Sequence, residues 1–353
     1  MKHKTDKQSA GKGLLAFKEL ISTVYNPLSE AFKMKIISLA FAIIFPAVTF
    51  SVHAANVKIT PLGSHDGEFC SRDRALIFED PDGTRLLYDA GQTVAGAADP
   101  RLGKIDVVLV SHMHGDHVGN QTINNVNQGE CAKPDASVNA LPNTNVVNIA
   151  LTKKAKIITG SEMPKYFASK LKASGGDPNK SQLVRFGGSI DAGGVVITTV
   201  PAVHSNGVSA EMIGGYLGQM LGASGLTAYA GPPTGYVLTF SNGLVVYLSG
   251  DTGITAEQDL VVRQHYRAKL AVMNIGDTYT TGPTEAAYVI NEMIKPASVI
   301  ASHANEAATK NGKVIAGTRT DIFIKATKIP VHVPLSGKTM LFDSAGKCVA
   351  GCE

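Results

Sequence analysis

The sequence predicts an α/β fold of two mixed β-sheets flanked by helices, formed by a single domain over residues 56–353. Short β-branched runs separated by Gly and Asp turns follow residue 56, and strands alternate with helices in the second half. The composition, 44% hydrophobic and 18% charged, is typical of a chain that buries a sizeable core.

The first sheet is predicted from strands at residues 57–61, 75–79, 85–88 and 107–110. Residues 80–83, Asp-Pro-Asp-Gly, form a hairpin turn between two of them, because Pro presets φ and Gly supplies a positive φ. This sheet therefore opens with antiparallel strands.

The second half predicts strands at 195–200, 236–240, 245–248, 270–275 and 298–301, and helices at 256–267, 284–294 and 318–327. No repeat or linker divides residues 56–353, which favours one domain. Two stretches depart from this rhythm: the Asn-rich residues 120–150 and the Gly-rich, apolar residues 211–235. We expect functional loops or disorder there.

Residues 1–55 are interpreted as an N-terminal extension with a signal peptide at about 34–54. Residues 36–50 are uncharged, follow Lys33 and Lys35, and precede small residues suited to a signal peptidase. The apolar run is shorter than the roughly 20 residues that span a bilayer, so a retained anchor is the weaker alternative. Whether translation starts at Met1 or at Met34 stays open. We expect a periplasmic or secreted protein without stable membrane insertion after cleavage.

Charge and cysteine content narrow the partners and the compartment. Residues 1–54 contain seven Lys and three acidic residues, which leaves 26 of each sign from the chain's 33 bases and 29 acids. This balance argues against a nucleic-acid partner, and we expect a small-molecule substrate instead; the oligomeric state stays open. The four cysteines suit disulfides in an oxidising compartment. Three pairings are possible, and the positions of the cysteines favour Cys70 with Cys131 and Cys348 with Cys352. A metal site built from these cysteines is the weaker alternative, because the sequence lacks the CxxC spacing of structural zinc sites.

The strongest chemical signal is the run from Ser111 to His117, Ser-His-Met-His-Gly-Asp-His, directly after an apolar strand. In an extended strand end His112 and His114 point the same way, so both can reach one ion. Asp116 and His117 follow where the chain turns, and can serve a second position. Imidazole suits zinc, iron, nickel or copper, and added carboxylates admit manganese.

This HxHxDH motif resembles that of the metallo-β-lactamase superfamily, over nearly all of residues 57–340. The resemblance implies a four-layer αββα sandwich and two divalent metal ions, zinc or manganese. By resemblance, His112, His114 and His204 hold the first metal, Asp116, His117 and His303 hold the second, Asp251 bridges them, and Asp89 orients a ligating His from behind. His53, His65, His265 and His332 fall outside the pattern, although His65 could line the pocket.

A water bridging two such ions would lose a proton near neutral pH and attack a carbonyl or phosphorus, with Asp116 as the catalytic residue that orients it or passes a proton. Segments such as 246–253 resemble the ascorbate-6-phosphate lactonase-like metal-dependent hydrolases, which implies cleavage of a lactone, ester or phosphoester. The alternatives are β-lactamase-type amide hydrolysis, against which Asp251 argues, and a non-catalytic periplasmic metal-binding protein. Residues 211–235 could wall a pocket for an acyl chain, or form a packed helical hairpin.

Overall fold

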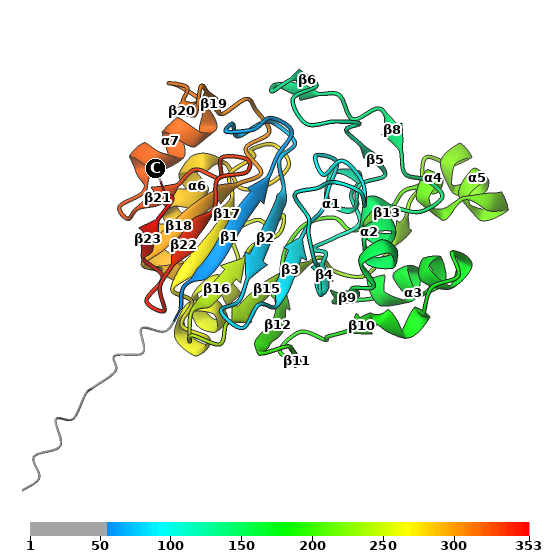
Figure 1. Ribbon diagram of the computed structural model, residues 1–353, viewed down its shortest axis with the longest axis horizontal. Coiled ribbons are helices and arrows are strands. Elements are labelled where there is room, and N and C mark those ends of the chain that lie inside the picture. Colours follow the sequence, from blue (N-terminus) through cyan, green and yellow to red (C-terminus); the bar gives the residue numbers. More distant parts are fainter. Residues whose placement is uncertain (1–54, 353) are drawn as a thin grey trace, which may run out of the picture. The chain divides into compact units, whose positions relative to one another are not determined.

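The computed structural model describes residues 55–352, in which two β-sheets pack against each other between helices (Figure 1). The first sheet has the strand order β10 (Ser181–Leu183), β9 (Lys156–Thr159), β4 (Val107–Leu109), β3 (Arg85–Tyr88), β2 (Ala75–Glu79), β1 (Val57–Leu62), β22 (Met340–Phe342), β23 (Cys348–Ala350). The second has the order β11 (Ser189–Ala192), β12 (Val195–Pro201), β15 (Thr234–Thr239), β16 (Val245–Leu248), β17 (Leu270–Asn274), β18 (Ser298–Ser302), β21 (Val331–His332).

Three buried clusters define the layers. Leu76 and Phe78 of β2 face the second sheet, whereas Ala75 and Ile77 face helices α2 (Asn145–Lys153) and α3 (Met163–Ala173). On the other side, the second sheet packs against η2 (Gln258–His265), α6 (Pro283–Tyr288), η3 (Val289–Ile294) and α7 (Arg319–Ala326). Because successive strand residues face opposite layers, both sheets are buried on both faces. This arrangement confirms the predicted four-layer αββα fold.

The strands that lead into the predicted site end at the same edge of the sandwich. In the first sheet β3 and β4 run parallel. In the second, β16, β17 and β18 run parallel, and β12 points the same way because two antiparallel pairings separate it from β16. The loops that follow β3, β4, β12, β16 and β18 carry all the predicted site residues.

The structure corrects several element predictions. The predicted helix 256–267 is a π-helix over Gln258–His265, and the predicted helix 284–294 is α6 continued by the π-helical η3. Helices α2 and α3 were missed. A Thr144 side chain caps α2 by accepting from the Val147 N–H, a signal within the stretch predicted to be irregular.

The two stretches predicted as loops or disorder are ordered. Residues 120–144 hold short pairs of β5 (Gln121–Thr122) with β8 (Val138–Asn139) and β6 (Gly129–Glu130) with β7 (Lys133–Pro134). We call residues 121–139 the pocket loop. Residues 211–235 overlap α4 (Ala210–Ile213) and contain α5 (Gly215–Ala223) and β14 (Ala228–Tyr229). Strand β14 pairs with β13 (Gly207–Val208). Helices α4 and α5 lie at the periphery (Figure 1).

The disulfides are Cys70–Cys131 and Cys348–Cys352, as the sequence positions favoured. We call the second the tail disulfide. The predicted signal peptide and His53 lie outside the described residues. Among residues 55–352 no helix combines the length and apolar character needed to cross a bilayer.

Candidate metal centre

Seven side chains from both sheets gather at the shared strand edge. His112 and His114 follow β4, and the chain then turns into the one-turn helix α1 (Gly115–Val118), which carries Asp116 and His117. The second sheet contributes His204 after β12, Asp251 after β16 and His303 after β18. Gly250, at φ +59°, lets the second sheet approach Ser111 where any Cβ would overlap that side chain.

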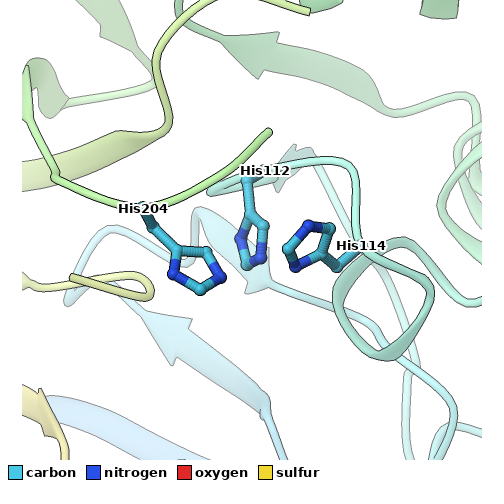
Figure 2. Close-up of side chains that lie close together, drawn as sticks. All are labelled: His112, His114 and His204. Atoms are coloured by element: carbon cyan, nitrogen blue, oxygen red, sulfur yellow. The ribbon is translucent and has the colours of Figure 1, made fainter. Parts of the chain in front are cut away.

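His112, His114 and His204 form the first group (Figure 2). Their ring centroids lie 4.4 Å apart for the first pair and 5.1 Å apart for each pair with His204. One nitrogen of each ring lies within 4.8 Å of the others. Three imidazoles that converge in this way can share one ion.

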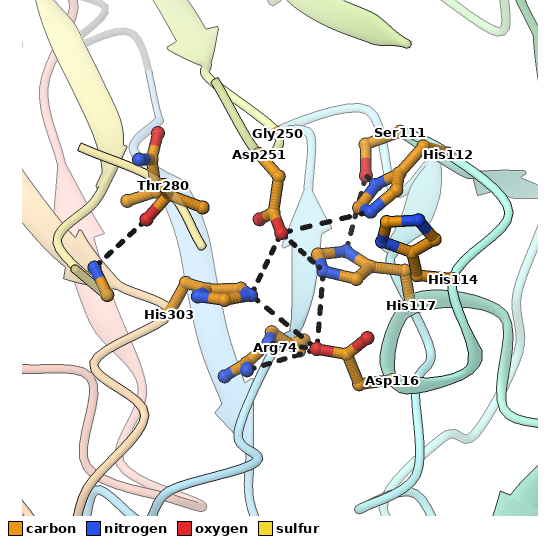
Figure 3. Close-up of polar contacts among 12 residues, drawn as sticks. Arg74, Ser111, His112, His114, Asp116, His117, Gly250, Asp251, Thr280 and His303 are labelled. Carbon is orange, nitrogen blue, oxygen red and sulfur yellow. Dashed lines mark hydrogen bonds and ion pairs between the residues drawn. The ribbon is translucent and has the colours of Figure 1, made fainter. Parts of the chain in front are cut away.

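Asp116, His117 and His303 form the second group, and Asp251 lies between the groups (Figure 3). Asp251 Oδ2 lies 3.0 Å from His303 Nε2 and 3.4 Å from His117 Nε2. The same oxygen lies 3.8 Å from His112 Nε2 and 3.7 Å from His204 Nε2. Ligand atoms on one tetrahedral ion with bonds of about 2.0–2.1 Å lie about 3.3 Å apart. These separations therefore suit a site in which Asp251 and the surrounding imidazoles would hold divalent metal ions together.

Unpaired buried atoms test whether this cluster fits metal ions. His112 Nε2, His117 Nε2 and His303 Nε2 are buried without a hydrogen-bond partner among the described residues, and so is Asp251 Oδ1. Burying a polar atom without a partner is costly unless something else pairs with it. Imidazole nitrogens and carboxylate oxygens are the donors that divalent transition metals take, and the three Nε2 atoms lie close to Asp251 Oδ2, so these residues fit metal ions.

Asp89 contacts the His112–His117 motif from the side away from the cavity. Its Oδ2 lies 2.8 Å from His117 Nδ1 and accepts from Ser111 Oγ at 2.7 Å. Ser111 Oγ in turn lies 3.0 Å from His112 Nδ1. Because the carboxylate and the serine oxygen accept from the two Nδ1 atoms, the Nε2 atoms of both rings keep their lone pairs for a cation. Asp89 itself has φ 42°, a conformation that costs energy outside glycine.

The histidines of the first group are neutral and ready to bind a metal ion, whereas His117 of the second group holds a proton that a metal ion has to displace. Burial holds the pKa of His112, His114 and His204 below its ordinary value, so these rings are neutral. Burial also opposes charge on His117, but Asp251, Asp116 and Asp89 together raise its pKa well above the ordinary value. A metal bound there has to replace that proton, so binding would release it.

Two residues that sequence reasoning missed support Asp116. Arg74 Nη2 lies 3.1 Å from Asp116 Oδ2 and also donates to Asn305 Oδ1 at 2.6 Å. Asp116 Oδ2 is thereby fixed 3.6 Å from His117 Nε2 and 3.5 Å from His303 Nε2. The sequence offered only a weak signal: two arginines lie in the run Ser71-Arg72-Asp73-Arg74, directly before β2.

A cavity of about 460 Å³ opens on the cluster. Its wall is polar and includes side chains of Arg72, Arg74, Gln92, Asn120, Tyr279 and Asn305 beside the metal-ligand candidates. No residue of 211–235 lines it, so the idea that this stretch walls an acyl pocket is wrong. Its helical hairpin instead exposes Tyr216 and Leu217.

The remaining described histidines lie outside the cluster. His65 does not line the cavity; its Nε2 lies 3.2 Å from the Gly129 carbonyl of the pocket loop. His265 is exposed at the end of η2, and His332 is buried against Phe342.

Comparisons with known proteins agree with this geometry. Residues 84–304 match the model of a beta-lactamase superfamily domain. A UPF0173 metal-dependent hydrolase of Pelotomaculum thermopropionicum is 31% identical over 249 residues, which cover 70% of this chain and 85% of that protein. One of Koribacter versatilis is 27% identical over 236 residues, 66% of this chain and 82% of the relative. A solved metallo hydrolase of Ignicoccus hospitalis aligns with TM-score 0.52 and 21% identity, covering 82% of this chain and 99% of its own; it shares the fold.

Proposed function

The chain belongs to the beta-lactamase superfamily and is a metal-dependent hydrolase of it, and from this premise we propose that it cleaves a lactone, ester or phosphoester of a small molecule with two divalent ions. Zinc and manganese are the metals that the His and Asp donors suit best. The observation that carries the proposal is that five of the seven candidate ligands line a cavity large enough for a small substrate: His114, Asp116, His204, Asp251 and His303.

The bound ions would lower the pKa of water and polarise the substrate oxygen, which is the chemistry that hydrolysis at neutral pH needs. The chain's own residues supply the rest. Asp116 Oδ2 is held by Arg74, whereas Asp116 Oδ1 has no hydrogen-bond partner among residues 55–352 and its side chain is 30% exposed. Asp116 Oδ1 is therefore the atom best suited to carry a proton to the leaving group.

Metal content and hydrolysis of the purified protein test the proposal together. The panel pairs lactones and carboxylic esters with phosphodiesters and β-lactams. We expect about two metal ions per chain and chelator-sensitive cleavage of a lactone, ester or phosphoester. Asp116→Asn should lose most turnover, since the amide cannot carry the proton, while the His112, His114 and His204 group should still hold the first ion. Full metal content without turnover on every member would favour the non-catalytic metal-binding protein, and preferential β-lactam cleavage would replace the proposed substrate class.

The protein is proposed to act in the periplasm or outside the cell. Two disulfides and the uncharged segment 36–50 after two lysines support export, because disulfides persist in oxidising compartments. N-terminal sequencing of protein from fractionated cells tests this. A mature chain that begins near residue 55 in the exported fraction supports it, and an uncleaved cytosolic chain with free thiols refutes it.

A further inference from the structure

We propose that the substrate carries an oxyanion group remote from the scissile bond and that Arg72, at the wall of the cavity, binds it. The inference rests on the proposed hydrolase function and adds a substrate class to it: acids and their derivatives that keep one free carboxylate or phosphate.

Two arginines reach this cavity, and only one is already fully bonded. Arg74 is buried and uses all three of its nitrogens: Nε and Nη2 donate to Asp116, Nη2 also to Asn305, and Nη1 to the carbonyls of Ser71 and Asp73. Arg72 makes one hydrogen bond, from Nη1 to Gln92 Oε1 at 2.7 Å. Among residues 55–352 it has no carboxylate within salt-bridge distance, so its other donors remain for a ligand.

Arg72 sets the direction of the hydrogen bonds along the cavity wall. A guanidinium can only donate, so Gln92 must present its oxygen to Arg72 and its amide nitrogen to the next residue. Gln92 Nε2 accordingly donates to Asn120 Oδ1 at 3.0 Å. Asn120 Nδ2 is then left as a donor with no acceptor among the described residues. The wall therefore offers free N–H groups from Arg72 and Asn120, which complement an acceptor-rich anion.

This row of donors leads to the metal-binding loop. Asn120 lies against Gly115, where any Cβ would overlap the Asn120 amide oxygen. Gly115 stands between His114 and Asp116, so one end of the row adjoins the candidate ligands and the other end is Arg72. A substrate whose reacting group sits at the ligands can thus place a second polar group along the wall.

The backbone that carries Arg72 is also anchored before any ligand arrives, and the Gln92 contact orients its side chain. The Cys70–Cys131 disulfide joins its segment to the pocket loop. Beside it, the Ser71 N–H donates to the Cys131 carbonyl at 3.1 Å, and Ser71 Oγ donates to the Ala132 carbonyl at 2.8 Å. A cation fixed in advance binds an anion with less loss of entropy than a mobile surface side chain. The planar fork of Arg matches both carboxylate and phosphate.

Binding of chain-matched probes tests the inference without requiring turnover. Pentanoate, glutarate and 4-phosphonobutyrate each offer one carboxylate to the metal centre, and glutarate and 4-phosphonobutyrate carry a second anionic group. Two further pairs, butyrate with succinate and hexanoate with adipate, vary the distance between the two ends of the probe. Calorimetric titration into the metal-loaded protein should show at least about tenfold tighter binding of a doubly anionic probe than of its monoanionic partner, because a second charge-assisted contact forms. A preference for the phosphonate over the dicarboxylate identifies phosphate as the source of the anion.

Three variants locate the effect. Arg72→Gln should bring the affinity ratio close to one, and Arg72→Lys should keep part of it, because a point charge remains without the fork. Arg185→Gln is the matched control, since Arg185 is 63% exposed and pairs with Glu162 outside the cavity. Equal binding of both probe types at every length, or a ratio that Arg72→Gln leaves intact at unchanged metal content, overturns the inference. Absence of hydrolysis would instead refute the proposed function alone.

Discussion

Substituting Gly276 should weaken the second metal position by displacing His303. A Cβ at Gly276 would lie 2.6 Å from His303 Nδ1 and 2.6 Å from the His303 carbonyl oxygen, whereas ordinary contact begins at 3.4 Å. The Ala variant therefore has to move the ring or the backbone by about 0.8 Å. Metal sites tolerate errors of about 0.2 Å, and disturbing a ligand's support typically costs about 10–100-fold in metal affinity, or about 1.4–2.7 kcal/mol.

Metal titration of the Gly276→Ala protein, followed by elemental analysis after dialysis, measures the loss. We expect one of two ions to dissociate about 10–100-fold more readily. Gly253→Ala is the matched control, because the nearest atom to its Cβ would be the Val203 carbonyl oxygen at 3.9 Å. In a His303→Ala background the Gly276 change should have little further effect on affinity, since the ring is already gone. Equal affinities for Gly276→Ala and Gly253→Ala would refute the argument.

Three further predictions concern the support of the site and the buried charges. Asp89→Asn should lower metal affinity by about 10–100-fold, because His117 loses its anionic acceptor; an unchanged titration would contradict this. Replacing both Cys70 and Cys131 by Ser should lower the free energy of unfolding by about 4 kcal/mol, because the disulfide closes a loop with a sequence separation of 61. Removing the tail disulfide, with a separation of 4, should lower it by only about 2 kcal/mol. Denaturant titration of the two variants measures both values. Burial raises the pKa of Asp73 from its ordinary 3.8 to about 6, so the folded chain binds the extra proton and stability is lost as the pH rises from about 4 to 6, by about 3 kcal/mol. Asp73→Asn should remove that slope, and parallel pH curves for variant and wild type would contradict the assignment.

The fold was predictable wherever burial pattern and turn chemistry agreed. Strands β1 to β4 were each predicted near their observed positions, and the antiparallel hairpin of β2 and β3 around the turn at 80–83 is present as expected. The parallel pairing of β3 with β4 was not predicted. Residues 145–153 and 163–173 were missed because short helices with mixed faces resemble loops in an Asn-rich or Lys-rich context. Strand β22 was missed because three residues give too short a pattern to detect.

The candidate site also has a part that the sequence predicts and a part that only the structure reveals. The His and Asp positions follow strand ends in a fixed order, which a sequence displays directly. Arg72, Gln92 and Asn120 come from three separate loops and share no spacing, so only the packed chain brings them to one wall. The Cys70–Cys131 pairing was suggested by position, but not its contact with the residue next to Arg72.

The metal centre takes side chains from both sheets, and this links occupancy to folding. His112, His114, Asp116 and His117 come from one sheet, and His204, Asp251 and His303 from the other, so the whole ligand set exists only while the two sheets are docked. An ion that binds this set stabilises the folded chain by mass action, by about 2.7 kcal/mol at a free concentration 100 times its dissociation constant. Metal in the surrounding medium should therefore lengthen the survival of the protein under heat and proteolysis, even when no substrate is present.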